Sequence, residues 1–134
     1  MNIFINLPVK DLTKTNSFYQ TLGFEFNPNF SGETATCMKI NDQAWVMLLT
    51  EAYFKTFIKK EICDATRSTE VLVAIDRTSK AEVDQFLDKV LALGGTEARD
   101  TQDLGFMYSR AFNDPDGHIW EVFWMNPSQI PDNK

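Results

Sequence analysis

The fold is decided by residues 113–124, which read Asn113-Asp114-Pro115-Asp116-Gly117-His118-Ile119-Trp120-Glu121-Val122-Phe123-Trp124. Pro115 fixes its own φ angle and Gly117 tolerates a positive one, so the first part of this stretch predicts a tight turn. The residues that follow predict a strand, in which alternation places Ile119, Glu121 and Phe123 on one face. A single carboxylate, Glu121, therefore lies on an otherwise apolar strand face.

The first half of the chain predicts one βαβββ module over about residues 1–50. Residues 2–8 predict a strand, and Asp11–Leu22 a helix that Asp11 or Thr13 caps and Gly23 ends. Extended segments are predicted near 24–30, 34–40 and 44–50. A linker helix is predicted over about 51–61.

The same order of elements returns in the second half, over about residues 69–125. A strand is predicted from Thr69 to Asp76, then a helix that Ser79 and Glu82 cap and that ends at Gly94. Extended segments are predicted near 96–101, 105–113 and 118–125. The sequence thus predicts an α+β fold in which two modules form one domain over 1–134, because neither half alone can bury both faces of its sheet.

Several short motifs resemble a known family. Val9-Lys10-Asp11-Leu12 is followed by Ser17-Phe18-Tyr19 and Leu22-Gly23-Phe24, and Asp114-Pro115-Asp116-Gly117 precedes Glu121. In this order and spacing they resemble the vicinal oxygen chelate superfamily, which includes glyoxalase I, bleomycin-resistance proteins and extradiol dioxygenases. The resemblance covers nearly the whole chain and implies two modules whose mixed sheets curl into an open cup. It indicates the activity far less, because one fold supports many functions.

Composition narrows the choice of partners. A chain of 134 residues with 43% apolar and 24% charged content is typical of one globular domain. The net charge of −6, with Lys59-Lys60 as the only basic pair, argues against a nucleic-acid surface. The N-terminus lacks a basic segment followed by an apolar one, and no apolar run approaches the length of a membrane span. We therefore expect a cytoplasmic protein with no nucleic-acid or membrane partner.

The resemblance also implies positions for a metal site. In members that use a metal, side chains on the first and last strands of each module hold one divalent ion, and the matching positions here are Phe4, Leu48, Glu70 and Glu121. Phe4 and Leu48 have no donor atoms, whereas a catalytic metal needs three or four ligands. We therefore expect no metal site and no cofactor, with a weak residual divalent ion at Glu70 and Glu121 as the alternative.

The hairpin before Glu121 suggests a different partner for this carboxylate. If residues 114–117 form a four-residue loop, Asn113 pairs with His118, and Arg110 faces Glu121 across the two strands. The guanidinium would then keep the carboxylate ionised and compete with any cation. A slip of one residue would move Arg110 to the opposite face, so this pairing depends on the loop length.

Two further polar residues allow two interpretations each. Glu70 begins the first strand of the second module and lies either in the cup, above Leu72 and Ala74, or in solvent at the strand start. His118, the only histidine, is predicted on the face opposite Glu121, which favours a surface or core-edge position over catalysis.

These observations favour a glyoxalase and bleomycin-resistance-like protein that binds a small organic molecule in an apolar, metal-free cup. Glu121 is the candidate catalytic residue, and the predicted ligand pocket contains Phe4, Asn6, Leu48, Glu70, Arg110, Glu121 and Phe123. The alternative is a metal-dependent lactoylglutathione lyase or isomerase of the glyoxalase I kind, in which Glu121 moves a proton. An extradiol dioxygenase is less favoured because its iron needs two His ligands. We also expect a homodimer, because the chain has more large aromatic side chains than so small a domain can bury.

Overall fold

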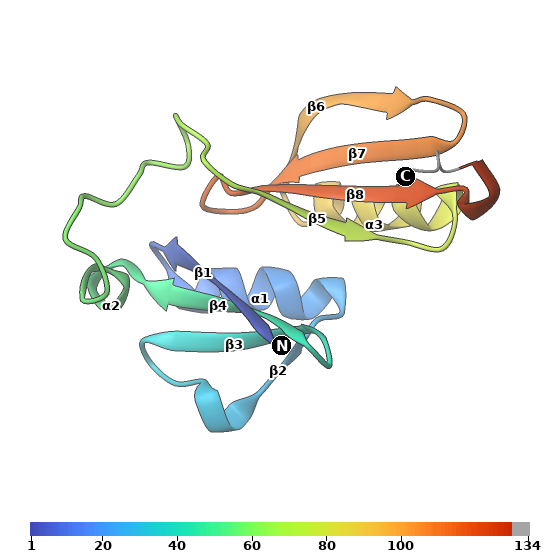
Figure 1. Cartoon of the computed structure of the whole chain (residues 1–134). Coiled ribbons are helices and arrows are strands. Elements are labelled where there is room, and N and C mark those ends of the chain that lie inside the picture. The colour runs from blue at the N-terminus through green and yellow to red at the C-terminus, as the bar shows by residue number, and fades with distance from the viewer. Residues whose placement is uncertain (130–134) are drawn as a thin grey trace. The chain divides into compact units, whose positions relative to one another are not determined.

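Two four-stranded sheets, each with one long helix, make up the computed structural model, which describes residues 1–129 (Figure 1). The chain divides into two units, the first Met1–Asp64 and the second beginning at Ala65. In each unit the chain runs through a strand, a long helix and three further strands. This order confirms the predicted α+β class and the two βαβββ modules.

The first unit contains a mixed sheet with the strand order β1-β4-β3-β2. β1 (Ile3–Val9) pairs in parallel with β4 (Ala44–Thr50), and β4 pairs antiparallel with β3 (Ala35–Asn41), which in turn pairs with β2 (Glu25–Phe26). Helix α1 (Leu12–Leu22) connects β1 to β2. Asp11 caps this helix by accepting a hydrogen bond from the backbone N–H of Lys14 over 3.1 Å, and Gly23 ends it at a φ angle of 105°.

The core of the first unit lies between the sheet and α1. The hydroxyl of Thr36 on β3 donates to the side-chain oxygen of Asn16 on α1 over 2.6 Å, which identifies the face of the sheet that the helix covers. Strand pairing places Leu48 beside Thr36 and Leu7 beside Leu48, so all three lie on this helix side. Leu7, Thr36 and Leu48 are buried because this side of the sheet packs against the helix and is removed from water.

The second unit repeats the topology with the strand order β5-β8-β7-β6. Its strands are β5 (Leu72–Asp76), β6 (Thr96–Asp103), β7 (Met107–Asn113) and β8 (Ile119–Met125), with β5 and β8 parallel and the other neighbours antiparallel. Helix α3 (Lys80–Ala92) begins after Ser79, whose hydroxyl accepts the N–H of Glu82 over 3.1 Å. The predicted Ser79 cap is therefore confirmed.

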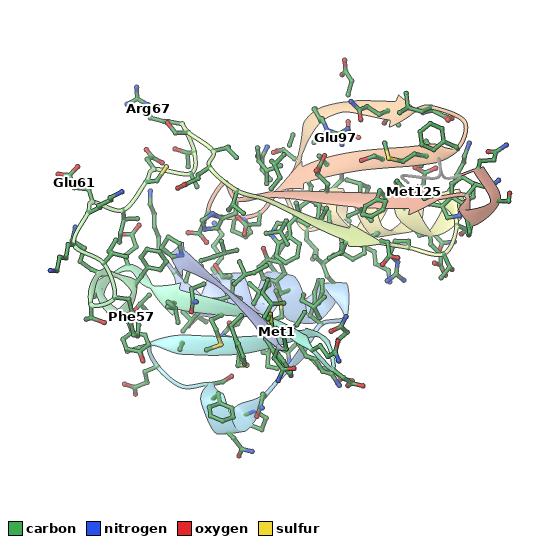
Figure 2. The ribbon with its side chains drawn as sticks, in the orientation of Figure 1. Met1, Phe57, Glu61, Arg67, Glu97 and Met125 are labelled. Atoms are coloured by element: carbon green, nitrogen blue, oxygen red, sulfur yellow. The ribbon has the colours of Figure 1, made fainter. Side chains whose placement is uncertain are left out.

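The segments outside the paired strands are shorter than the sequence predicted. Helix α2 (Glu51–Lys55) ends early, at Thr56, whose hydroxyl donates to the carbonyl of Tyr53 over 2.7 Å. From there the chain runs through Phe57, Glu61 and Arg67 to β5 in turns and bends (Figure 2). Two short 3₁₀ turns, Pro28–Phe30 and Pro127–Gln129, complete the described elements. No helix within residues 1–129 has both the length and the apolar character that crossing a bilayer requires.

Candidate functional site

The second sheet has one face covered by α3 and one face that α3 leaves open, which we call the helix-free face. Arg110 and Tyr108 of β7 both contact Asp84 of α3, so these residues lie on the helix side. Ala111 and Ser109 alternate with them and lie on the helix-free face. Because Ala111 pairs with Glu121 and Ser109 with Phe123, these two β8 residues share the helix-free face, as the sequence predicted.

The predicted pairing of Arg110 with Glu121 is wrong by one residue. Arg110 stands opposite Val122, and Ala111 stands opposite Glu121. The loop is one residue longer than assumed, because Asn113 pairs with Ile119 rather than with His118. The backbone N–H of Asp114 donates to the carbonyl of His118 over 2.9 Å, and the Asp114 carboxylate accepts the N–H of His118 over 2.9 Å. The hairpin loop therefore includes His118, and the slip moves Arg110 to the helix side.

Arg110 instead takes part in a network between β7, β6 and α3. Its guanidinium donates to Asp84 over 3.1 Å and also binds Glu97, which Figure 2 labels on β6. The hydroxyl of Tyr108 donates to the same Asp84 oxygen over 2.7 Å. That hydrogen bond, with burial, raises the pKa of Tyr108 above its usual range. These contacts hold the helix against the sheet, so Arg110 is not available on the face that carries Glu121.

A different arginine, Arg99 of β6, binds Glu121. Its Nη2 donates to Glu121 Oε2 over 2.8 Å and to Ser109 Oγ over 2.7 Å, and its Nη1 donates to the carbonyl of Asp100 over 3.1 Å. The side chains of Arg99 and Glu121 retain 29% and 26% exposure, so the pair is partly buried but reaches the surface. The sequence analysis missed both Arg99 and Ser109.

Cross-strand pairing explains how Arg99 reaches Glu121. Arg99 pairs with Ala111, Ala111 with Glu121, and Glu121 with Ala74, so these four residues form one row across the sheet, which we call the Glu121 row. Arg99 and Glu121 are two strands apart, about 10 Å between backbones, a span that their side chains together can cover. They meet above Ala111 because a methyl group leaves room for both. The sequence contained little indication that Arg99 meets Glu121, because the pairing of β6 with β7 is irregular on both sides of Arg99 and its register is hard to predict.

The first unit also has a helix-free face, which carries Phe4, Asn6 and Met47. The rings of Phe4 and Trp45 stack with centroids 5.0 Å apart, and Phe4 is 53% exposed. Leu48 was expected on this face, but it lies on the helix side and is fully buried, at 0% exposure. That expectation is therefore wrong, because the strand position was assigned one residue too far along β4.

The two units are internal repeats, and their pairing shows which positions correspond. Asn6 pairs with Met47 in the first unit as Ala74 pairs with Glu121 in the second. The helix caps Asp11 and Ser79 follow Asn6 and Ala74, respectively, by five residues. Met47, not Leu48, therefore corresponds to Glu121.

Glu70 is also displaced from its predicted place. It is exposed and precedes β5, which begins at Leu72. Ala74, the β5 residue beside Glu121, follows four residues later, which is about 13 Å of extended chain. This separation supports the interpretation of Glu70 as a solvated residue before the strand.

Comparisons with known proteins agree with this fold. Residues 2–41 match the family described as bleomycin resistance protein-like N-terminal. A hypothetical protein, SA1046, from S. aureus is 28% identical, with 92% of this chain and 93% of that chain covered and a TM-score of 0.79. A glyoxalase/bleomycin resistance protein/dioxygenase family enzyme from Burkholderia phytofirmans PsJN is 15% identical, with coverage of 91% and 96% and a TM-score of 0.75. These comparisons confirm the predicted resemblance to the vicinal oxygen chelate superfamily. No curated protein matches this chain.

A further solved structure with this fold corrects the expectation of a cofactor-free protein. The fosfomycin resistance protein FosX from Listeria monocytogenes, in a complex with Mn(II) and sulfate, is 23% identical, covers 96% of this chain and 92% of its own, and has a TM-score of 0.70. A protein with this fold therefore binds a metal, and the expectation of no cofactor, which rested on four assigned positions, does not stand. Two of those positions, Leu48 and Glu70, are themselves misplaced.

The residues around Glu121 do not by themselves form a ligand set for a metal. Glu121 is the only carboxylate in the Glu121 row, and Arg99 already occupies its Oε2. Within residues 1–129, no three His, Cys, Asp or Glu side chains gather closely enough to hold an ion. The described side chains offer hydrogen bonding here, with the Arg99 guanidinium as a donor, the Glu121 carboxylate as an acceptor and the Ser109 hydroxyl as either.

Proposed function

We propose that this protein binds a small organic molecule over the helix-free face of its second sheet, with Arg99 and Glu121 as the polar contacts and Phe123 as part of the apolar surface. One observation carries the proposal. A partly exposed ion pair, 2.8 Å between Arg99 Nη2 and Glu121 Oε2, lies on the helix-free face, where the β8 neighbours of Glu121 are the apolar side chains Ile119 and Phe123. A few polar groups on an apolar surface are the usual composition of a small-molecule site.

Stability alone is a weaker explanation for this ion pair. Replacing a partly buried pair by apolar side chains is often neutral or stabilising, so such a pair is weak support for a purely structural role. The contact between α3 and the sheet has its own ion pair, Arg110 with Asp84, on the opposite face. Arg99 and Glu121 connect β6 and β8, which are already joined through backbone pairing of each with β7. A role in ligand binding explains why charged groups occupy this face.

Binding is favoured over catalysis by the same contact. A general base must be free to accept a proton from the substrate, whereas Glu121 Oε2 already accepts a hydrogen bond from Arg99. The lactoylglutathione lyase alternative would require Arg99 to move away from Glu121. An assay for lactoylglutathione lyase activity with added Ni²⁺, Zn²⁺ and Mn²⁺ distinguishes binding from catalysis. Metal-dependent turnover that disappears in Glu121→Gln would favour the lyase.

The proposal is tested by screening a library of small organic molecules against ¹⁵N-labelled protein. We expect bound compounds to shift the backbone amide signals of Ala111, Glu121 and Ala74, and Arg99→Met or Glu121→Gln to weaken that binding at least fivefold. Arg77→Gln is the matched control, because Arg77 pairs with Glu82 at the exposed start of α3, 3.9 Å apart and away from this face. Hits that shift only amides elsewhere, or that bind the variants as well as the wild type, would contradict the proposal.

Two further proposals concern the whole chain. We propose that it forms a homodimer, because Ile3, Phe4 and Leu72 are large apolar side chains that are each more than half exposed on edge strands. The expected cytoplasmic location also stays a proposal.

A further inference from the structure

The ion pair between Arg99 and Glu121 leaves hydrogen-bonding groups free on both partners. Arg99 Nη2 donates to both Glu121 and Ser109. The ion pair between Arg99 and Glu121 is therefore held through one nitrogen rather than through two parallel hydrogen bonds. Among residues 1–129, Glu121 Oε1 accepts no hydrogen bond and Arg99 Nε donates none. Neither atom is among the buried polar atoms that lack a partner, so both are accessible. Glu121 therefore has a free acceptor and Arg99 a free donor beside their ion pair.

The surroundings allow a ligand to approach the carboxylate closely. Glu121 is flanked on the neighbouring strands by Ala74 and Ala111, whose methyl groups are the smallest side chains that an L-residue can carry. Ala74 is exposed, so that side of Glu121 is open. Larger residues at either position would cover the free oxygen.

The charges of the site select against ions. Arg99 and Glu121 carry opposite charges 2.8 Å apart, so a ligand with a single charge is attracted by one and repelled by the other, and it also loses hydration. A neutral group with a donor next to an acceptor can bond to Glu121 Oε1 and to the guanidinium at once. Asp76 lies further along β5 on the same face, but it is exposed and its charge is screened by water.

We propose that the ligand of this face is a neutral molecule that presents a hydrogen-bond donor and an acceptor side by side, as in a primary amide, a urea or a cyclic imide. The donor of the ligand bonds to Glu121 Oε1, and its acceptor receives a hydrogen bond from Arg99. This inference rests on the proposed binding function, because it specifies the class of ligand for the same site.

Four probes that share a phenyl ring test the ligand class: benzamide, N,N-dimethylbenzamide, benzoate and benzamidine. Benzamide is neutral with both groups, its dimethyl form lacks the donor, and the last two are an anion and a cation. We expect benzamide to bind wild-type protein at least threefold more tightly than each of the others, with dissociation constants taken from amide shifts of Ala111 and Glu121. Tighter binding of any other probe at these amides would overturn the ligand class but leave the binding function standing. If none of the four probes shifts these amides, the proposed ligand class is also overturned. The binding function itself is decided by the library screen.

Substitutions of the two charged residues should reverse the preference in opposite directions. Glu121→Gln leaves Arg99 uncompensated, so benzoate should become the tightest probe. Arg99→Met leaves Glu121 uncompensated, so benzamidine should become the tightest. The double variant Arg99→Met with Glu121→Gln should show no preference between the ions, and it keeps the test valid if Arg99→Met does not fold. An unchanged order of affinities in folded Glu121→Gln would contradict the proposal.

Discussion

Arg99 on β6 reaches across Ala111 of β7 and binds Glu121 on β8, with Nη2 2.8 Å from Oε2. The contact joins residues 22 positions apart in the sequence. It depends on three strands in one register and on a small residue in the middle strand. A change in any of these would separate the two charges.

A double-mutant cycle tests this contact. Arg99→Met and Glu121→Gln, alone and together, should show a coupling energy of about 1 to 2 kcal/mol in urea unfolding, between the values typical of exposed and of buried pairs. The control pairs Arg110→Met with Glu121→Gln, whose effects should add within about 0.5 kcal/mol because Arg110 lies on the other face. Strong coupling in the control, with none between Arg99 and Glu121, would restore the hairpin register that the sequence suggested.

The size of the middle residue provides a second test. Ala111 is 1% exposed, so Ala111→Leu should overpack the face and lower the free energy of unfolding by about 1 to 3 kcal/mol. In that background, the coupling between Arg99 and Glu121 should fall toward zero. Ala74→Leu, on the exposed flank of Glu121, is the control and should leave the coupling intact. Full coupling in a folded Ala111→Leu variant would show that the arginine does not pass over this residue.

Gly117 in the hairpin loop is expected to resist substitution. Its φ angle is +91°, and a Cβ there would lie 2.8 Å from the carbonyl oxygen of Ala65. Gly117→Ala should therefore cost about 1 to 3 kcal/mol of stability, measured by chemical unfolding. Gly32→Ala is the matched control, since nothing lies within 4 Å of its added Cβ. Equal stability of the two variants would contradict the backbone assigned to this loop.

The start of α3 should contribute stability that depends on pH. The Thr78 hydroxyl and backbone N–H donate to Glu82 over 2.6 and 2.9 Å, and these bonds lower the pKa of Glu82 below its usual value of 4.5. A lowered pKa in the folded state means that the contribution is complete above pH 4.5 and is lost as the pH falls through the folded value. Wild type should thus exceed Glu82→Gln in stability at neutral pH and lose that advantage in acid. Glu33→Gln, at an exposed loop carboxylate, is the matched control.

The proposed homodimer is tested by light scattering at micromolar concentration. We expect a mass of twice the 15.4 kDa of the chain. Phe4→Ser should shift the equilibrium toward monomer, because Phe4 is 53% exposed and its removal reduces the apolar surface available for contact. A mass of 15.4 kDa for the wild type at these concentrations would rule the dimer out.

Local patterns were sufficient to predict the elements and their order. Asp11 and Gly23 mark the ends of the first helix, and Ser79 marks the start of the second long helix, because capping depends on residues within one turn of each other. Alternation in β8 correctly placed Glu121 and Phe123 on one face, since a strand repeats every two residues. The resemblance to a family followed from motifs such as Asp114-Pro115-Asp116-Gly117, which combine turn chemistry with fixed spacing.

Only the tertiary structure decided which side chains meet Glu121. The loop that includes His118 shifts the hairpin by one residue, which exchanges the faces of Arg110 and Ala111, and the sequence contains no local signal of that length. Similarly, Leu48 was placed on the wrong face by a single position in β4. The approach of Arg99 depends on the pairing of β6 with β7 and of β7 with β8, which is set by packing and backbone hydrogen bonds between distant segments. Because side chains in a strand alternate between two faces, a register shift of one residue moves each side chain to the opposite face. The sequence alone therefore determined the fold, and the tertiary structure decided the site.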